Sequence, residues 1–236
     1  MRKKMLPQEA LKLIACITML IDHFGASLLL ELQIPKMAQI YYACRIIGRI
    51  AFPIYCFLLA EGMRHTRNPV KYILRLGIGI ALAELPFDFL FEGGFTWAHQ
   101  SVMVTLTLGA LMLLCMRETD KKWLKLLAVL PFALLAGYAH SDYGRWGIVM
   151  IAVFGLFDRW PLQALGLLLV NVLMRSAAVP FCGLSVPIQL FAVLAMIPIA
   201  LYSGRKLSHS RVVQWGFYLF YPVHLLILWM ILLLIR

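Results

Sequence analysis

Charged side chains are scarce in this sequence, and their scarcity restricts the class of protein. Only 14% of the 236 residues are Asp, Glu, Lys or Arg, whereas 62% are hydrophobic and the mean hydropathy is +0.84. An average soluble domain carries about 25% charged residues. The composition therefore excludes an ordinary soluble fold.

Several familiar chemical motifs are also absent. The sequence has no GxxxxGK(S/T), GxGxxG, HExxH or GxSxG element, so nucleotide hydrolysis, dinucleotide binding, zinc proteolysis and serine hydrolysis lack support. Its five cysteines are scattered, with no CxxC spacing and no Cys and His arrangement suited to zinc. We expect no bound metal.

What the sequence does contain is a series of apolar runs close to the ~20 residues that cross a bilayer, separated by short polar breaks. This pattern predicts an all-α polytopic membrane protein, one domain over residues 1–236, with about nine transmembrane helices. We expect the first run to be retained as a helix, and the polar break "FDRWP" leaves eight or ten crossings open. The expected helices cover residues 8–30, 38–62, 69–90, 101–116, 122–139, 145–158, 160–175, 185–202 and 211–235.

The basic residues predict an orientation. Most of the 22 Lys and Arg fall in alternate breaks between the runs, beginning with Arg2, Lys3 and Lys4. Because cytoplasmic loops are enriched in Lys and Arg, the N-terminus is expected in the cytoplasm. The same loops account for the net charge of +11, and no aromatic-interleaved basic patch suggests nucleic acid.

Seven ionisable residues interrupt the apolar runs. Such side chains cost several kcal/mol at mid-bilayer, so they usually face a protein interior or a wet cavity and mark function. Ion pairs between helices, with no chemistry, are the alternative. The seven are Asp22, His23, Arg45, Arg49, Glu84, Asp88 and His224.

The spacing of these residues predicts which of them share a face. Arg45 and Arg49 are four residues apart, as are Glu84 and Asp88, so each pair projects from one side of its helix. Asp22 and His23 are adjacent and about 100° apart around a helix. We therefore expect a carboxylate from another helix, Glu84 or Asp88, to orient His23.

Prolines and loop residues add further candidates. Pro53 and Pro222 each remove one backbone hydrogen bond, which predicts kinks beside the polar cluster. His224 lies near Tyr218 in "FYLFYPVHLLILW", either at the site or as hydrogen-bonded packing. Asp142 in "AHSDYGRWG" either lines the mouth of the site or makes a turn.

The polar residues sit in segments that resemble one family. The segments "TMLIDHFG", "GRIAFPIYCFLLAEGMRHTRN", "AELPFDFLFEG", "SDYGRWG" and "YPVHLLIL" occur in this order over nearly the whole chain and together resemble the TraX family. This resemblance implies a bacterial inner-membrane protein that transfers acetyl groups from acetyl-CoA to an amine or hydroxyl. The acceptor implied by the best-known member is the N-terminus of a conjugative pilin.

The resemblance also implies roles for particular residues. His23, beside Asp22, is similar to the intramembrane catalytic histidine of the wider acyltransferases and would act as general base. Arg45 and Arg49 would stabilise an oxyanion or hold the acceptor, together with Tyr218, His224 and Asp142. The spacing "RIIGR" differs from the RxxR pair of sugar O-acyltransferases. The phosphates of CoA would meet the cytoplasmic residues Arg64, His65, Arg67 and Lys71, or these residues only signal topology.

Two other classes of function remain open. The Asp, His and Arg set would also suit a transporter for protons or anions, although no inverted repeat is visible. A non-catalytic assembly factor that docks a pilin-like helix is the third class. Consumption of acetyl groups would separate the enzyme from both.

Overall fold

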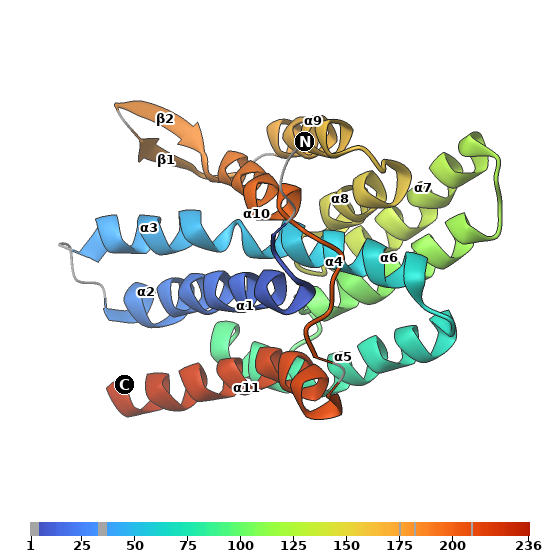
Figure 1. Ribbon diagram of the computed structural model, residues 1–236. Helices are drawn as coiled ribbons and strands as arrows, with labels where there is room; N and C mark the ends of the chain where they lie inside the picture. The colour runs from blue at the N-terminus through green and yellow to red at the C-terminus, as the bar shows by residue number, and fades with distance from the viewer. Residues whose placement is uncertain (1–4, 33–36, 175, 182, 209) are drawn as a thin grey trace. The chain divides into compact units, whose positions relative to one another are not determined.

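The computed structural model of the chain describes residues 5–32, 37–174, 176–181, 183–208 and 210–236 (Figure 1). Their regular secondary structure is helical apart from one short hairpin. The first half contains α1 (Gln8–Phe24), η1 (Gly25–Leu29), α2 (Leu30–Leu32), α3 (Ala38–Gly48), α4 (Ala51–His65), α5 (Pro69–Phe91) and α6 (Val102–Arg117). The second half contains α7 (Lys122–Tyr138), α8 (Gly144–Leu156), α9 (Trp160–Leu173), β1 (Ala178–Phe181), β2 (Leu184–Pro187), η3 (Ile188–Ala195), α10 (Met196–Ala200) and α11 (Arg211–Ile235).

Eight of the nine helical ranges expected from the sequence begin and end within about three residues of the observed ones. The prediction of one helix over residues 185–202 is wrong. Its first residues form β2, which pairs antiparallel with β1, and the 3₁₀ segment η3 precedes the short α10. Pro187 explains the late start, because the residue before a proline is driven into extended conformation.

The two prolines behave differently. The helical stretch Ala38–His65 departs from α-helix at Arg49 and Ile50, so it is interrupted at Arg49, whose carbonyl would have received a bond from Pro53. This interruption was expected. Around Pro222, by contrast, α11 continues as one helix from Arg211 to Ile235.

Within the described parts of the chain, three helical stretches are long and apolar enough to cross a bilayer: Gln8–Leu32, Ala38–His65 and Val212–Ile235. Shorter apolar helices accompany them, and many large hydrophobic side chains on their surfaces are exposed. In water such a surface would drive aggregation, whereas in lipid it needs no cover. The fold is that of a helical membrane protein.

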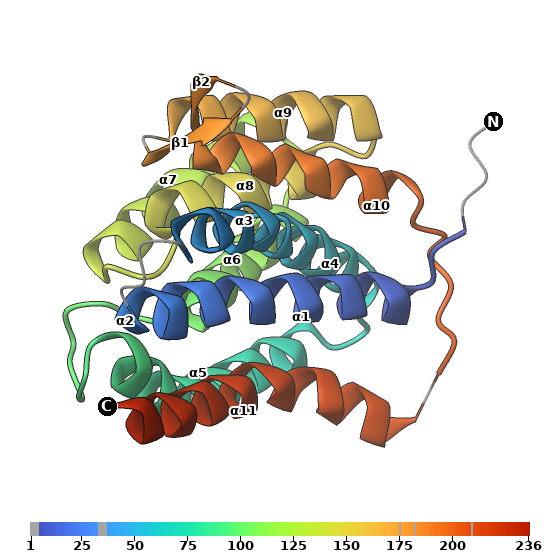
Figure 2. The ribbon, with the colours of Figure 1, turned by 90° about the vertical axis from the view of Figure 1, so that its left-hand side faces the viewer.

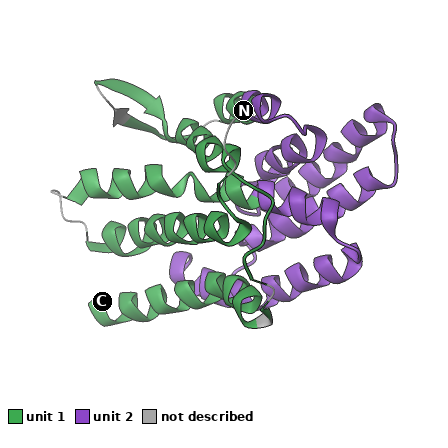
Figure 3. Ribbon diagram, viewed as in Figure 1, with its two compact units in different colours: residues 1–55, 167–236 green, residues 56–166 purple. Residues whose placement is uncertain are grey.

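The chain forms two compact units, coloured separately in Figure 3. Unit 1 comprises residues 1–55 and 167–236. Within it α1 packs against both α3 and α11 and lies between them in Figure 2, while η3 packs against α3. Residues from these four elements make the candidate active site.

Unit 2 comprises residues 56–166. Here α6 packs against α5, α7 and α8, and α7 packs against α8. The helix α5 begins with a cap, since the side chain of Asn68 accepts a hydrogen bond from the Lys71 amide at 2.9 Å and Pro69 occupies the first turn. The expectation of a single domain over residues 1–236 stays a prediction.

Candidate active site

Asp22 of α1 is the carboxylate that meets both arginines of α3. Its Oδ2 accepts a hydrogen bond from Nη1 of Arg45 at 2.8 Å, and its Oδ1 and Oδ2 each lie 2.9 Å from Nη2 of Arg49. The side chain of Asp22 is 11% exposed, so these are ion pairs largely removed from solvent. The spacing of four residues puts both guanidinium groups on the face of α3 that packs on α1.

Two glycines allow α1 and α3 to approach this closely. A methyl group added at Gly48 would overlap Oδ1, Cβ and Cγ of Asp22, and one added at Gly25 would lie 2.6 Å from Cβ of Cys44. Small residues at a helix interface let two backbones come together. The ion pairs therefore depend on glycine at these two positions.

The two arginines differ in what else they contact. Arg49 donates from Nη1 to Oε1 of Gln189 at 3.1 Å and from Nε to the carbonyl of Arg45 at 3.2 Å. Gln189 belongs to η3 and is 2% exposed. Arg49 is thus anchored to three elements, whereas Arg45 makes one side-chain contact, to Asp22, within the described residues. A guanidinium carries five N–H donors, so Arg45 retains donors for a ligand.

His23 faces a different helix from Asp22, as its place around α1 predicts. Its Nδ1 lies 2.7 Å from Nε2 of His224 in α11, and the two ring planes differ by 5°. His224 is 4% exposed. The group beside Nδ1 of His23 is therefore an imidazole, where a carboxylate was expected.

This chain of hydrogen bonds fixes the tautomer of both rings. Nδ1 of His224 lies 2.7 Å from the carbonyl oxygen of Phe220, and a carbonyl only accepts, so Nδ1 of His224 carries a proton. In neutral His224 the Nε2 is then an acceptor, and His23 must donate to it from Nδ1. Neutral His23 consequently keeps an unprotonated Nε2, the nitrogen that a general base needs.

Local structure around His23 departs from a regular α-helix. Directly after it the chain forms the π-helical turn η1, and Ser27 donates from Oγ to the carbonyl of His23 at 2.6 Å. Turns of this type occur frequently at functional sites. Tyr221, 6% exposed, meets both histidines, with ring centroids 6.1 Å from His23 and 5.6 Å from His224. Arg45 and Arg49 are close enough to interact electrostatically with the His23 ring.

Unit 1 therefore brings together five of the residues expected from the sequence: Asp22, His23, Arg45, Arg49 and His224. Tyr218 is also on α11, where its ring contacts that of Trp215, with the centroids 6.2 Å apart. The sequence reasoning missed Gly25, Gly48, Gln189 and Tyr221. The glycines of "DHFG" and "RIIGR" were a usable signal, since glycine inside a transmembrane helix often marks a close contact.

Glu84 and Asp88 lie in unit 2, on one face of α5, and both accept hydrogen bonds from the segment that follows this helix. Glu84 accepts from the amide of Ser101 at 3.2 Å and from its hydroxyl at 2.6 Å. Asp88 is 1% exposed and accepts from the amide of Thr96 at 3.1 Å. Their expected action on His23 stays a prediction. Oδ1 of Asp142 accepts a hydrogen bond from the Tyr143 amide at 3.0 Å, in the turn before α8.

The expected CoA residues lie at the opposite end of α5, and one of them is engaged by the protein itself. Arg64 donates to the carbonyls of Phe154 and Gly155, at 2.6 and 3.3 Å, and pairs with Glu61 and Asp158. A cation at these carbonyls, which end α8, also suits the negative end of the helix dipole. His65 contacts the carbonyl of Glu61 through Nδ1 at 2.8 Å. Arg67 and Lys71 are exposed.

The apolar helices and the buried cluster of Asp, Arg and His side chains define a helical membrane protein with a polar site among its helices. Comparison with known proteins identifies its family. A family model described as "TraX protein" matches residues 7–232, and the chain therefore belongs to the TraX family, as its sequence motifs indicated.

Two curated proteins show the likeness individually. The chain is 29% identical over 235 residues to "Probable fimbrial assembly protein FimC, serogroup H1" of Dichelobacter nodosus, and the alignment covers 92% of each chain. It is 28% identical over 148 residues to "Protein TraX" of Escherichia coli, and this alignment covers 62% of the present chain and 54% of the relative. No solved structure matches the chain significantly.

Proposed function

We propose that this chain is an acetyltransferase of the bacterial inner membrane that moves an acetyl group from acetyl-CoA to an amine or hydroxyl acceptor. The observation that carries the proposal is the hydrogen-bonded chain from the Phe220 carbonyl through His224 to His23. It holds an imidazole with an unprotonated Nε2 inside an apolar protein, next to two guanidinium groups. In the proposed topology about nine helices cross the membrane and the N-terminus is cytoplasmic.

His23 is the general base of the proposed reaction. Its Nε2 removes a proton from the acceptor as the acceptor nitrogen or oxygen attacks the thioester carbonyl carbon. The carbon–sulfur bond then breaks, and the CoA thiolate leaves and receives that proton from His23. His224 accepts from Nδ1 of His23 throughout, so it stabilises the imidazolium while the proton is held.

The two arginines have different roles in the proposed reaction. Arg49, bonded to Asp22 and Gln189, fixes the position of Asp22 and of α3. Arg45 directs its remaining N–H groups at the oxyanion of the tetrahedral intermediate, where a preorganised donor is worth several kcal/mol. Asp22 orients both arginines through its ion pairs with them.

Donor and acceptor are also part of the proposal. The phosphates of acetyl-CoA meet the exposed Arg67 and Lys71 together with His65 and Arg64, although the contacts of Arg64 within unit 2 leave it less available. The acceptor is the N-terminus of a pilin-like protein, or another amine or hydroxyl at the membrane. The relatives named for TraX and for fimbrial assembly support this class of acceptor. Tyr218, Glu84, Asp88 and Asp142 remain candidate site residues.

Removal of His23 tests the base. Purified His23→Ala should bind acetyl-CoA as the wild type does but lose about 10²–10⁴-fold in acceptor-dependent release of free CoA thiol, the usual contribution of a general base. Release is measured with a thiol reagent, and acetylated acceptor by mass spectrometry. Glu31→Gln, on the same helical stretch but in an exposed pair with Arg236, is the control and should keep full activity. Undiminished transfer by a folded His23→Ala protein would refute the assignment.

The role of His224 is tested by what replaces its accepting nitrogen. His224→Phe leaves Nδ1 of His23 without an acceptor, and we expect kcat to fall about 10²-fold, within the range of a lost positioning partner, with little change in KM for acetyl-CoA. His224→Gln, whose amide oxygen accepts a hydrogen bond, should retain more activity. Equal losses in both variants would show that His224 acts through packing alone.

A second candidate function rests on the name of one relative. Because the D. nodosus protein is described as a probable fimbrial assembly protein, a non-catalytic role in docking a pilin-like helix is the competing proposal. A protein of that kind would bind the pilin-like helix and consume no acetyl-CoA.

Coupled flux of protons or anions in proteoliposomes without an acetyl donor would instead support a transporter.

A further inference from the structure

Two loops at one end of unit 2 are joined by hydrogen bonds. The amide of Gln100, in the loop between α5 and α6, donates to the carbonyl of His140 at 3.2 Å, and the amide of Asp142 donates back to Gln100 at 2.8 Å. Below them the hydroxyls of Thr105 and Ser141, both buried, are 2.8 Å apart. These bonds hold the 92–101 loop and the 139–143 loop in a fixed relation.

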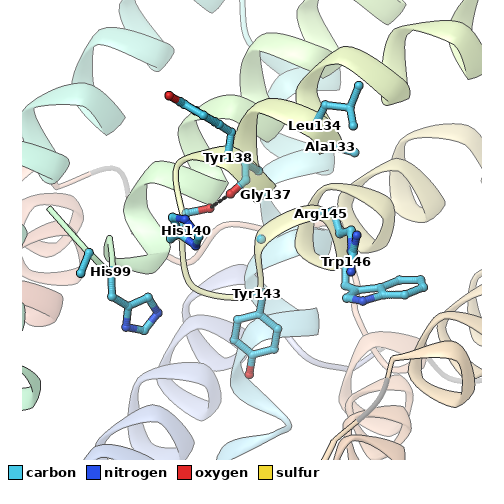
Figure 4. Close-up of a pocket in the computed structure, with 13 residues that line it drawn as sticks. His99, Ala133, Leu134, Gly137, Tyr138, His140, Tyr143, Arg145 and Trp146 are labelled. Carbon is cyan, nitrogen blue, oxygen red and sulfur yellow. Dashed lines mark hydrogen bonds between the residues drawn. The ribbon is translucent and has the colours of Figure 1, made fainter.

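A pocket of about 620 Å³ opens where these two loops meet α7 and α8 (Figure 4). Its volume is within the range that holds a small ligand. His99 lies on one side of the view, Arg145 and Trp146 on the other, with Tyr143 between them. Arg145 gives the pocket a permanent positive charge, the rings of His99 and His140 also line it, and none of the lining residues carries a carboxylate. The pocket is therefore suited to an anion.

Two residues that line the pocket, His140 and Tyr143, have left-handed backbone conformations. His140 and Tyr143 have φ angles of 49° and 60°, in the left-handed region that favours glycine. Glycine and asparagine are the residues that turns most often place at such positions. Here a histidine and a tyrosine occupy them, and both line the pocket.

Exposed aromatic residues surround the pocket and indicate its depth in a membrane. Tyr138, which also lines it, is 85% exposed, and Phe95 and Trp97 of the adjoining loop are 57% and 76% exposed. Aromatic side chains gather where the hydrocarbon of a bilayer meets its headgroups. Tyr138 is the last residue of α7, and Phe95 and Trp97 follow the end of α5. This pattern indicates a position at headgroup level for the pocket.

We propose that this pocket binds the phosphate of an anionic phospholipid headgroup. Arg145 is the main contact. It is exposed, and among the described residues no carboxylate lies within ion-pair distance of it; its guanidinium lies over the Trp146 ring at 6.0 Å. A guanidinium matches two phosphate oxygens at once.

The other lining groups complete the site. His99 is held by Glu92, whose Oε1 lies 3.3 Å from its Nδ1, and Arg145 supplies the permanent positive charge of the site. The ring of Tyr143 is the surface offered to the glycerol part of the headgroup. This proposal concerns unit 2 and does not depend on acetyl transfer at His23.

The test counts bound lipid on the full chain in detergent by native mass spectrometry, during titration with phosphatidylglycerol or phosphatidylcholine. We expect phosphatidylglycerol to be retained, phosphatidylcholine not, and Arg145→Gln to weaken retention about tenfold. The matched control is Arg159→Gln, another exposed arginine that lies beyond the opposite end of α8; it should bind phosphatidylglycerol as the wild type does. Wild-type retention by Arg145→Gln, or equal losses in the two variants, would overturn the proposal.

A second arm separates the two sources of the phosphate. Soluble glycerol 1-phosphate is added to the wild type at rising concentration with phosphatidylglycerol held constant. Retention that does not change shows that the lipid is the ligand. Displacement at concentrations comparable to the lipid shows that the same pocket takes a soluble phosphate ester. An unchanged thermal midpoint of Arg145→Gln confirms that the variant is folded.

Discussion

Asp22→Asn should destabilise the protein by about 3–5 kcal/mol, the cost of leaving a buried charge without its partner. The variant keeps the size of the side chain but removes the charge that both Arg45 and Arg49 face at 2.8–2.9 Å. Two guanidinium groups would then repel each other in a largely dry interface. The free energy of unfolding is measured in detergent, by denaturant titration followed with tryptophan fluorescence.

The chain offers a matched control for this variant. Glu31→Gln is the same change of acid to amide on the same helical stretch, and Glu31 also pairs with an arginine, Arg236, at 3.0 Å. That pair is exposed, with side chains 40% and 51% accessible, and pairs of this type are screened by solvent. We expect no measurable change in the free energy of unfolding. Equal effects of the two substitutions would show that the Asp22 cluster is no more than a surface ion pair.

Gly48→Ala should have the second largest effect although it adds only a methyl group. The new Cβ would overlap three atoms of Asp22, so either α3 moves away from α1 or the carboxylate leaves the arginines. Overpacking alone costs about 1–3 kcal/mol, and displacement of Asp22 adds part of the ion-pair loss. Under the proposed mechanism, acetyl transfer falls too, because Arg45 loses its position.

Gly216→Ala is the control for this second prediction. Gly216 lies inside α11 and an added Cβ there would meet nothing within 4 Å. In a helix, alanine is favoured over glycine by about 0.5–1 kcal/mol, so this variant should be as stable as the wild type or slightly more stable. In an Asp22→Gly background, which lacks the three overlapping atoms, Gly48→Ala should add no penalty. A full penalty in that background would locate the clash elsewhere.

Much of the fold could be predicted because hydrophobicity and backbone preference are local properties. The limits of α11 at residues 211 and 235 and the start of α5 at Pro69 follow from apolar runs and capping residues. The hairpin β1–β2 and the 3₁₀ segment η3 could not be predicted in this way. Their sequence is as apolar as a helix, and a strand in a two-stranded hairpin is decided by its pairing with β1.

The candidate site, like the fold, was predictable only in its local properties. The sequence alone determined that Asp22, His23, Arg45, Arg49 and His224 must face protein or a wet cavity, because an ionisable side chain is costly in lipid wherever its helix lies. It also determined that Asp22 and His23 point in different directions, which is a property of one helix.

Only the tertiary structure decided which of these side chains contact one another. It brought Asp22 to both arginines, placed His224 beside Nδ1 of His23, and added Gln189 from a segment 140 positions beyond Arg49. The physical reason is that periodicity fixes the face on which a side chain lies but contains no information about the neighbouring helix. That neighbour is chosen by packing, here by how closely two glycines let α1 and α3 approach.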